Sequence, residues 1–216
     1  MSVKLDIFSD PICPWCYIGK AYLERAIERA PDHPFLIEWH PFQLNPDMPM
    51  AGVDRRTYLE ARFGGKQNAV KAYARVMEAA EAAGVVIDFD KMPRVPNTLN
   101  AHRLIHWAGL ERLQGAAKTA LFKAYFQDGR DLGDLETLTD IGSEIGIDRT
   151  QLRRLFASDA DLADIRARDA HARSRGVSAV PTFILGGQYA MQGAQSADVW
   201  KSVLDDINKQ VPKVLH

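Results

Sequence analysis

Both cysteines of this 216-residue chain lie in one short motif, Cys-Pro-Trp-Cys at residues 13–16. The segment before it, residues 3–8, alternates apolar and polar side chains and predicts a β-strand. The segment after it carries apolar side chains at helical spacing until Pro31, which ends the helix. A C-x-x-C pair is therefore expected between a strand and the first turn of a helix, in a fold that mixes both kinds of element.

The middle of the chain has a different pattern. Bulky apolar residues at 35–39 predict a second strand, which Pro41 closes. Helical periodicity then continues from Asn45 to about Gly176 and predicts about six helices without strands. A structureless loop of roughly 130 residues is implausible in a compact domain, so we expect a folded helical insertion here.

Strand patterns return near the end of the chain. Residues 182–185 and 188–191 flank a Gly-Gly pair and predict a β-hairpin. A last helix is expected to begin at Ser196, which is a suitable cap, and residues 212–216 are expected to be frayed. The sequence thus predicts an α/β fold with two domains: residues 1–44 and 177–216 form one, and residues 45–176 form an inserted all-helical domain.

Composition and charge exclude several classes of function. The formal net charge of −1 gives no basic excess with which to bind nucleic acid or an anionic membrane. No apolar run is long enough to cross a bilayer, and Asp6 and Asp10, which we expect to be exposed, interrupt any signal-peptide core. The expected location is cytoplasmic, where structural disulfides are rare.

The position of the cysteine pair on its helix has a chemical consequence. Free N–H groups in the first turn of a helix, together with the helix dipole, favour a thiolate and lower its pKa. Cys13, nearer the helix end, is the predicted nucleophile, and Cys16 is placed to resolve a mixed disulfide. Pro14 suits the turn, and the Trp15 ring offers apolar contact beside the reactive sulfur.

Two other roles for the cysteines stay open at this point. A zinc site needs four ligands, and the chain has no further cysteine and no suitable histidine pair near the motif. His102 and His106 have helical i, i+4 spacing, but nothing in the sequence places them beside Cys13. The other alternative is that the two thiols are simply buried and unreactive. We expect no metal site and no other cofactor.

Residues 10–20 resemble the start of DsbA-family thioredoxin-like oxidoreductases, in particular the FrnE-like branch. The similarity spans almost the whole chain in the order of the family. It continues at residues 39–46, 97–104, 176–183 and 192–195. This resemblance implies a thioredoxin fold with a large inserted all-helical domain, in agreement with the pattern of strands and helices.

The resemblance also implies roles for individual residues. Cys13 is similar to the attacking thiol of the family and Cys16 to the resolving one. Pro181 is similar to the cis-proline that faces the two sulfurs, and the backbone of Val180 would then be free to pair with an extended substrate segment. An ordinary proline at the start of a strand is the alternative for Pro181.

Some positions depart from the family pattern or have two explanations. Trp15 stands where many relatives carry a histidine, so a very strongly oxidising disulfide is not expected. Ile7 stands where thioredoxin-like proteins often bury a carboxylate, so proton transfer to Cys16 needs water or another group. Asn97 and His102 belong to a family-like motif and are expected to line the substrate groove; the alternative is a helix cap and a surface residue.

The sequence therefore predicts a thiol–disulfide oxidoreductase that needs no metal or nucleotide. Its partners would be dithiol or disulfide substrates, either proteins or glutathione, and it would be a monomer or a homodimer. One alternative is a glutathione-dependent isomerase or transferase of the hydroxychromene carboxylate isomerase or kappa-class type, which typically has a serine where Cys13 stands. Another is a non-catalytic binding module with idle thiols.

Overall fold

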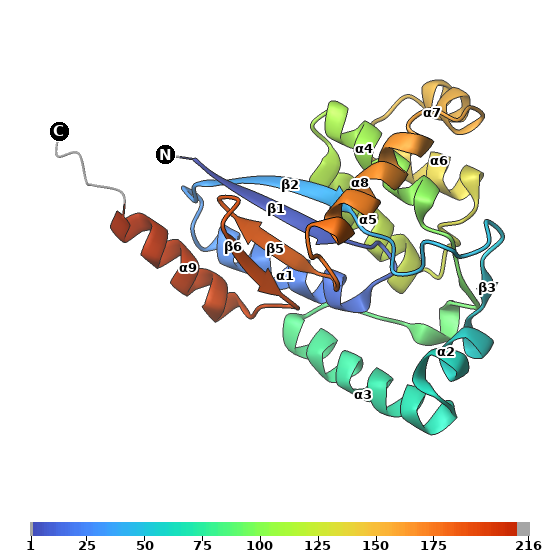
Figure 1. The fold of residues 1–216 in the computed structure, drawn as a ribbon, viewed down its shortest axis with the longest axis horizontal. Helices are drawn as coiled ribbons and strands as arrows, with labels where there is room; N and C mark the ends of the chain where they lie inside the picture. Colours follow the sequence, from blue (N-terminus) through green and yellow to red (C-terminus); the bar gives the residue numbers. More distant parts are fainter. Residues whose placement is uncertain (1, 211–216) are drawn as a thin grey trace.

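The computed structural model describes residues 2–210 (Figure 1). Its main sheet has four strands in the order β2-β1-β5-β6. Strand β1 (Val3–Ser9) pairs in parallel with β2 (Phe35–Pro41) and antiparallel with β5 (Thr182–Leu185). Strand β6 (Tyr189–Gln192) completes the sheet as the second half of a hairpin. The predicted strands and hairpin are confirmed.

Two helices pack together against one face of this sheet. Helix α1 (Pro14–Glu28) connects β1 to β2, and α9 (Ala197–Gln210) follows β6. The buried ring of Trp200 on α9 meets Phe183 of β5 edge-on, at a centroid distance of 4.8 Å. The prediction of frayed residues at 212–216 lies outside the described residues.

The stretch between β2 and β5 contains seven α-helices, whereas its helical periodicity predicts about six. Figure 1 shows them toward the right of the view, with α9 at the left and with α2 and α3 below the others. They are α2 (Arg55–Phe63), α3 (Lys66–Ala83), α4 (Leu99–Leu110), α5 (Gln114–Phe126), α6 (Leu135–Glu144), α7 (Arg149–Phe156) and α8 (Leu162–Ser174), with a 3-10 turn at Phe89–Lys91.

The expectation that this stretch lacks strands is wrong. Two short strands, β3 (Val53–Asp54) and β4 (Arg94–Val95), form a small antiparallel ribbon that brackets α2 and α3. Apolar periodicity does not predict helix α2, because this helix buries none of its residues and so has no apolar stripe. The exact division of the chain at residues 44 and 177 stays a prediction.

Strand β2 forms one outer edge of the main sheet, and side chains cover part of that edge. The Gln114 amide at the start of α5 accepts from the Trp39 N–H at 2.8 Å and donates to the Trp39 carbonyl at 3.0 Å. His33 accepts from the Phe35 N–H at 3.1 Å. Helix α5 is therefore fixed to the sheet.

No helix within residues 2–210 is both long and apolar enough to span a membrane.

Candidate active site

The two cysteines lie where β1 passes into α1. Cys13 has an extended backbone and precedes the helix, and Pro14 occupies its first position. The Cys13 carbonyl accepts the N–H groups of Cys16 and Tyr17, at 3.0 and 3.2 Å. Both thiols are free and buried, with 3% of Cys13 and 1% of Cys16 exposed. The predicted position at the first helical turn is confirmed.

The Val180–Pro181 peptide bond lies opposite the cysteines and is cis, as the family resemblance implies. The Cys13 sulfur lies 3.6 Å from the Val180 carbonyl oxygen. Helix α1 approaches Pro181 closely at Gly19, where an added Cβ would lie 3.2 Å from the Pro181 Cγ and 3.3 Å from the Cα of Ala194. Gly19 thus allows α1 to hold the cysteine pair against the proline.

The position of Cys13 at the start of a helix predicts a lowered pKa, but the surroundings of Cys13 in the structure raise it. A hydrogen bond to Cys16, followed by burial, holds the pKa of Cys13 well above its ordinary value. Burial also opposes ionisation of Cys16, but the hydrogen bond from Cys13, the positive charge of Lys118 and the Ser9 hydroxyl outweigh it and lower the pKa of Cys16. The positive charge of Lys118 therefore favours ionisation of the reduced pair.

A buried polar cluster lies beneath the cysteines, and sequence reasoning missed it. The Lys118 ammonium donates to Ser9 Oγ at 2.8 Å, and burial lowers the pKa of Lys118 to about 8. Asp10 is fully buried, so the expectation that it is exposed is wrong. Its carboxylate accepts the backbone N–H groups of Leu44 at 2.7 Å and Ile12 at 3.2 Å, and burial raises its pKa to about 6.

Asn97 and His102 do not line the cavity beside Cys13. The Asn97 amide donates to the Met48 carbonyl at 2.6 Å and accepts the Leu99 N–H at 2.9 Å, next to Thr98, the N-cap of α4. His102 is 2% exposed, so it is not a surface residue. Both side chains therefore belong to the interior that supports the site.

A cavity of about 480 Å³ opens beside Cys13. Pro14, Trp15 and Val180 contribute to its wall together with Cys13, so the structure brings four of the predicted site residues together. The opposite wall comes from α2, α3, the 3-10 turn and α5 and is rich in aromatic and basic side chains. These are Arg55, Tyr58, Arg62, Phe63, Tyr73, Arg75, Phe89, Tyr125 and Phe126.

The charge of this wall has one sign. It contains three arginines, and no aspartate or glutamate is among its described lining residues. Arg55 lies over the rings of Tyr73 and Phe89, at 4.8 and 4.7 Å, and donates to the Phe89 carbonyl at 3.2 Å. The cavity therefore pairs an apolar interior with a fixed positive charge.

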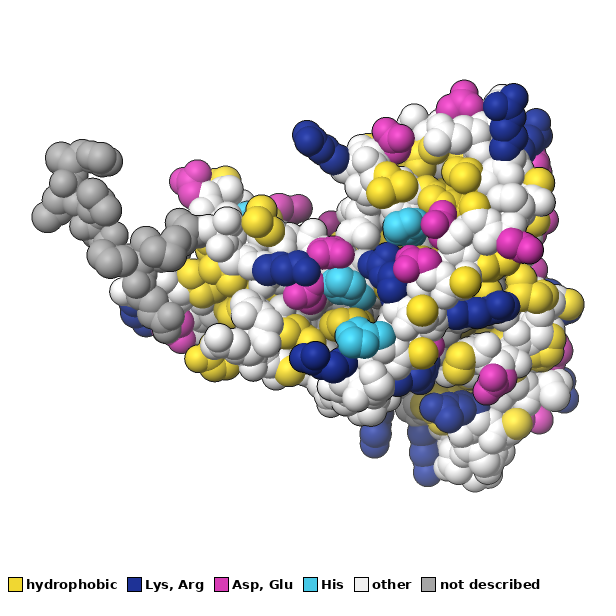
Figure 2. All heavy atoms as spheres, turned by 45° about the horizontal axis from the view of Figure 1, so that its top comes forward, with side chains coloured by type: hydrophobic (Ala, Val, Ile, Leu, Met, Phe, Trp, Pro, Cys, Tyr) yellow, Lys and Arg dark blue, Asp and Glu magenta, His cyan; other side chains and the backbone are white. Residues whose placement is uncertain are grey.

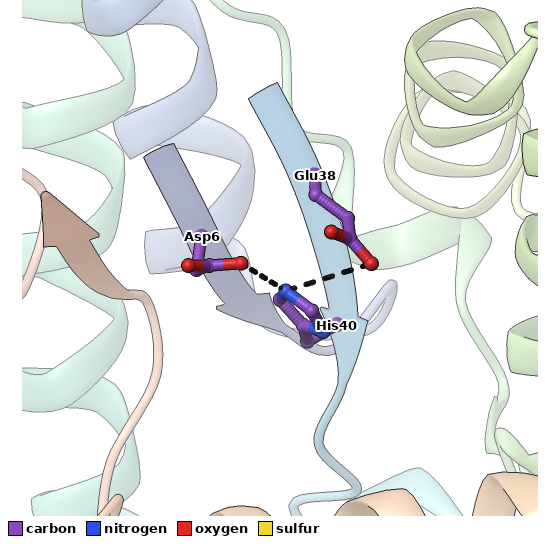
Figure 3. Close-up of side chains that lie close together, drawn as sticks. All are labelled: Asp6, Glu38 and His40. Carbon is purple, nitrogen blue, oxygen red and sulfur yellow. Dashed lines mark hydrogen bonds and ion pairs between the residues drawn. The ribbon is translucent and has the colours of Figure 1, made fainter. Parts of the chain in front are cut away.

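A separate polar cluster lies on the other face of the sheet, where Figure 2 shows histidines flanked by acidic and basic side chains. Asp6, Glu38 and His40 extend from β1 and β2 toward one another (Figure 3). His40 Nε2 is 2.6 Å from Asp6 Oδ1, and Lys4 bridges both carboxylates at 2.9 Å. Asp6 is partly buried by these ion pairs rather than freely exposed, and Lys4 already neutralises its charge.

Comparison with known proteins agrees with this geometry. A 30% identical relative, the uncharacterized protein YwbO of Bacillus subtilis (strain 168), matches over 211 residues, which is 97% of this chain and all of the relative. The crystal structure of a probable DsbA oxidoreductase, SCO1869 of Streptomyces coelicolor, is 27% identical and has a TM-score of 0.86, covering 99% of this chain and 93% of that one.

A more distant structure shows the same fold. The cytosolic disulfide reductase DsbM of Pseudomonas aeruginosa, solved with GSH, is 19% identical with a TM-score of 0.68, covering 95% of this chain and 99% of that one. The family model for the DSBA-like thioredoxin domain matches residues 4–205. With its thioredoxin fold, its C-x-x-C pair at the start of α1 and its cis-proline opposite, the chain belongs to the DSBA-like thioredoxin domain family.

Proposed function

We propose that this protein catalyses thiol–disulfide exchange through Cys13 and Cys16. The observation that carries the proposal is the placement of Cys13. It precedes the first turn of α1, its thiol lies 3.6 Å from the carbonyl of Val180, and it borders a cavity. A buried pair of unreactive thiols would need neither the cavity nor the donors around Cys16.

The exchange begins from a reduced pair that has lost one proton. Transfer of the remaining proton from Cys13 to Cys16 leaves a thiolate on Cys13, which attacks a sulfur of the substrate disulfide. One substrate sulfur leaves as a thiolate and the other stays in a mixed disulfide. Cys16, after losing that proton, attacks Cys13 and releases the second substrate thiol. The protein pair is then oxidised by two electrons, and a dithiol substrate reverses the sequence.

The backbone beside the proline supports a substrate-binding role for Val180 and Pro181. Within residues 2–210 the N–H of Val180 has no hydrogen-bond partner, and Pro181 has no N–H to donate. An extended substrate segment would therefore find an unused donor next to the sulfur that it must reach. Pro14 and Trp15, which is 37% exposed, would contact the same substrate from the side of α1.

The arginines of the cavity favour a second candidate, a glutathione-dependent isomerase or transferase. Glutathione carries carboxylates, and Arg55, Arg62 and Arg75 line the cavity without an acidic neighbour in its wall. The cysteine at position 13 favours exchange over this alternative, since enzymes of the latter type typically hold a serine there. Small anionic thiols and disulfides are thus the proposed substrates, in a reducing, cytoplasmic location.

Insulin reduction measured with the wild type and two variants tests the proposed function. We expect Cys13→Ser to abolish turnover because it removes the attacking sulfur. Cys16→Ser should instead accumulate a mixed disulfide at Cys13, detectable by mass, because the resolving thiol is missing. Equal activity of Cys13→Ser and the wild type would reject the assignment. Glutathione binding that is tight, non-covalent and unaffected by Cys13→Ser would favour the isomerase or transferase.

A further inference from the structure

Lys118 on α5 is buried beside the redox pair, although 109 residues separate it from its partner Ser9. Its side chain is 1% exposed, and its ammonium donates to Ser9 Oγ at 2.8 Å. The rings of Trp39 and Phe122 lie next to the ammonium, at 5.2 and 4.6 Å. Burial of an ammonium group in such surroundings is unfavourable unless a negative charge accompanies it.

The groups around Lys118 indicate which negative charge accompanies its buried ammonium. Lys20, the other buried lysine of the described residues, forms an ion pair with Glu24. Within residues 2–210, however, no carboxylate oxygen lies within 4.0 Å of the Lys118 ammonium. The groups that raise the pKa of Lys118 are, from the largest effect down, Cys16, Asp10 and Cys13; Lys20 lowers it, and the charge of Lys118 in turn lowers the pKa of His102.

We propose that Lys118 is a positioning residue for the redox reaction, whose buried positive charge stabilises the thiolate of the reduced pair. This inference rests on the proposed thiol–disulfide exchange. The Ser9 hydroxyl accepts a hydrogen bond from Lys118, and Lys118 and Ser9 both lower the pKa of Cys16, so the buried ammonium and this hydroxyl favour the same thiolate. Lys118 thereby supplies the group that the sequence lacks at Ile7.

The effect differs between the two redox states. When a substrate thiolate attacks Cys13 of the oxidised pair, the bond between Cys13 and Cys16 breaks and its electron pair leaves on Cys16, whose negative charge is favoured by the positive charge of Lys118. In the disulfide state no thiolate is present, and the ammonium stays buried without its partner. Lys118 therefore favours the reduced form and makes the disulfide easier to reduce.

Equilibration with glutathione redox buffers measures this preference. Lys118→Met keeps an unbranched side chain and removes the charge. We expect its equilibrium to move about tenfold toward the disulfide, which corresponds to a potential about 30 mV more negative. The thiolate absorbance of the reduced pair should also titrate at higher pH. The control is Lys20→Met, which removes a buried lysine that is paired with Glu24; its equilibrium and titration should shift far less than those of Lys118→Met.

Several results would overturn the proposal. Unchanged equilibrium and titration in Lys118→Met would do so, as would an equal shift in Lys20→Met. If Lys118→Met does not fold, NMR of lysine-labelled wild type decides the question. The pKa of Lys118 should be lower in the oxidised than in the reduced protein, and equal values reject the role. A wild type that forms no reversible disulfide in these buffers would instead reject the proposed function itself.

Discussion

The imidazole of His102 and the carboxylate of Asp10 lie close together inside the protein, with Nε2 and Oδ1 4.0 Å apart. Burial lowers the pKa of His102 well below its ordinary range and raises the pKa of Asp10 to about 6. Each environment thus favours the neutral form of its group. His102 Nε2 also has no hydrogen-bond partner among the described residues. The pair lies beneath the cysteines and makes protein stability depend on pH.

We predict that His102→Leu reduces the sensitivity of the fold to mild acid. Histidine in the unfolded chain binds a proton near pH 6.5, whereas folded His102 stays neutral, so its stabilisation is present above pH 6.5 and is lost as pH falls. Between pH 7.5 and 5.5 the wild type should lose about 1.4 kcal/mol more than His102→Leu. Urea midpoints at several pH values measure the difference.

Asp10 contributes the opposite slope. Because its folded pKa is raised, the folded protein keeps this proton longer than the unfolded chain, and stability falls as pH rises from about 4 to 6. This contribution is present in both proteins, so their difference isolates His102. His171→Leu, at an exposed position, is the control. A pH slope in His102→Leu equal to that of the wild type would contradict the prediction.

We predict that Gly19→Ala destabilises the protein, although alanine normally improves a helix. The added methyl group would meet the Cγ of Pro181 at 3.2 Å and the backbone of Ala194 at 3.3 Å, which forces α1 away from the proline. Overpacking of this kind costs about 1–3 kcal/mol. Thermal unfolding of Gly115→Ala, on α5 with open space around the new methyl group, should show no loss. A neutral or stabilising effect at Gly19 would contradict the close contact.

Arg55→Met is expected to change the choice of substrate. Loss of its guanidinium removes a fixed positive charge from the cavity wall, so kcat/KM for an anionic aromatic disulfide should fall about tenfold, in line with about 1.5 kcal/mol for a charged hydrogen bond. Reduction of the uncharged bis(2-hydroxyethyl) disulfide should not change. Arg56→Met is a matched control, since Arg56 is exposed and lies next to Glu60. Equal losses for both disulfides would argue against charge recognition.

Replacement of Gln114 with Met should weaken the outer edge of the sheet. The variant leaves the N–H and C=O of Trp39 without their partner, at an expected loss of about 1–2 kcal/mol in the free energy of unfolding. It also uncovers an edge that another chain can pair with, so light scattering on heating should increase. The exposed Gln67 on α3 provides the control substitution. Wild-type stability in Gln114→Met would disprove this role.

The sequence was sufficient for the parts of the fold that local pattern determines. Alternation of apolar and polar residues located β1, and the Gly186-Gly187 pair located the hairpin. The same reasoning found the cysteines at the start of α1. It missed α2, because a helix without buried residues has no stripe to detect.

The chemistry beneath the cysteines depends on contacts between distant segments, and here the sequence was insufficient. Asp10 follows a strand and precedes a proline, a pattern typical of an exposed turn. It is buried because segments that are distant in the sequence, such as the one at Leu44, fold over it. Lys118 stood among Ala117, Leu121 and Phe122 on an apolar face, and this was the available signal for a buried lysine. The direction of the Cys13 pKa shift required knowing which cysteine faces Lys118.

The reactive centre is assembled from both ends of the chain. Cys13 and the carbonyl it contacts at Val180 are 167 residues apart, and Lys118 comes from between them. During synthesis on the ribosome the cysteines therefore emerge long before the residues that control them. A nascent chain carries two ordinary thiols. The reactive cysteine pair forms only after the last strands have been synthesised and the chain has folded.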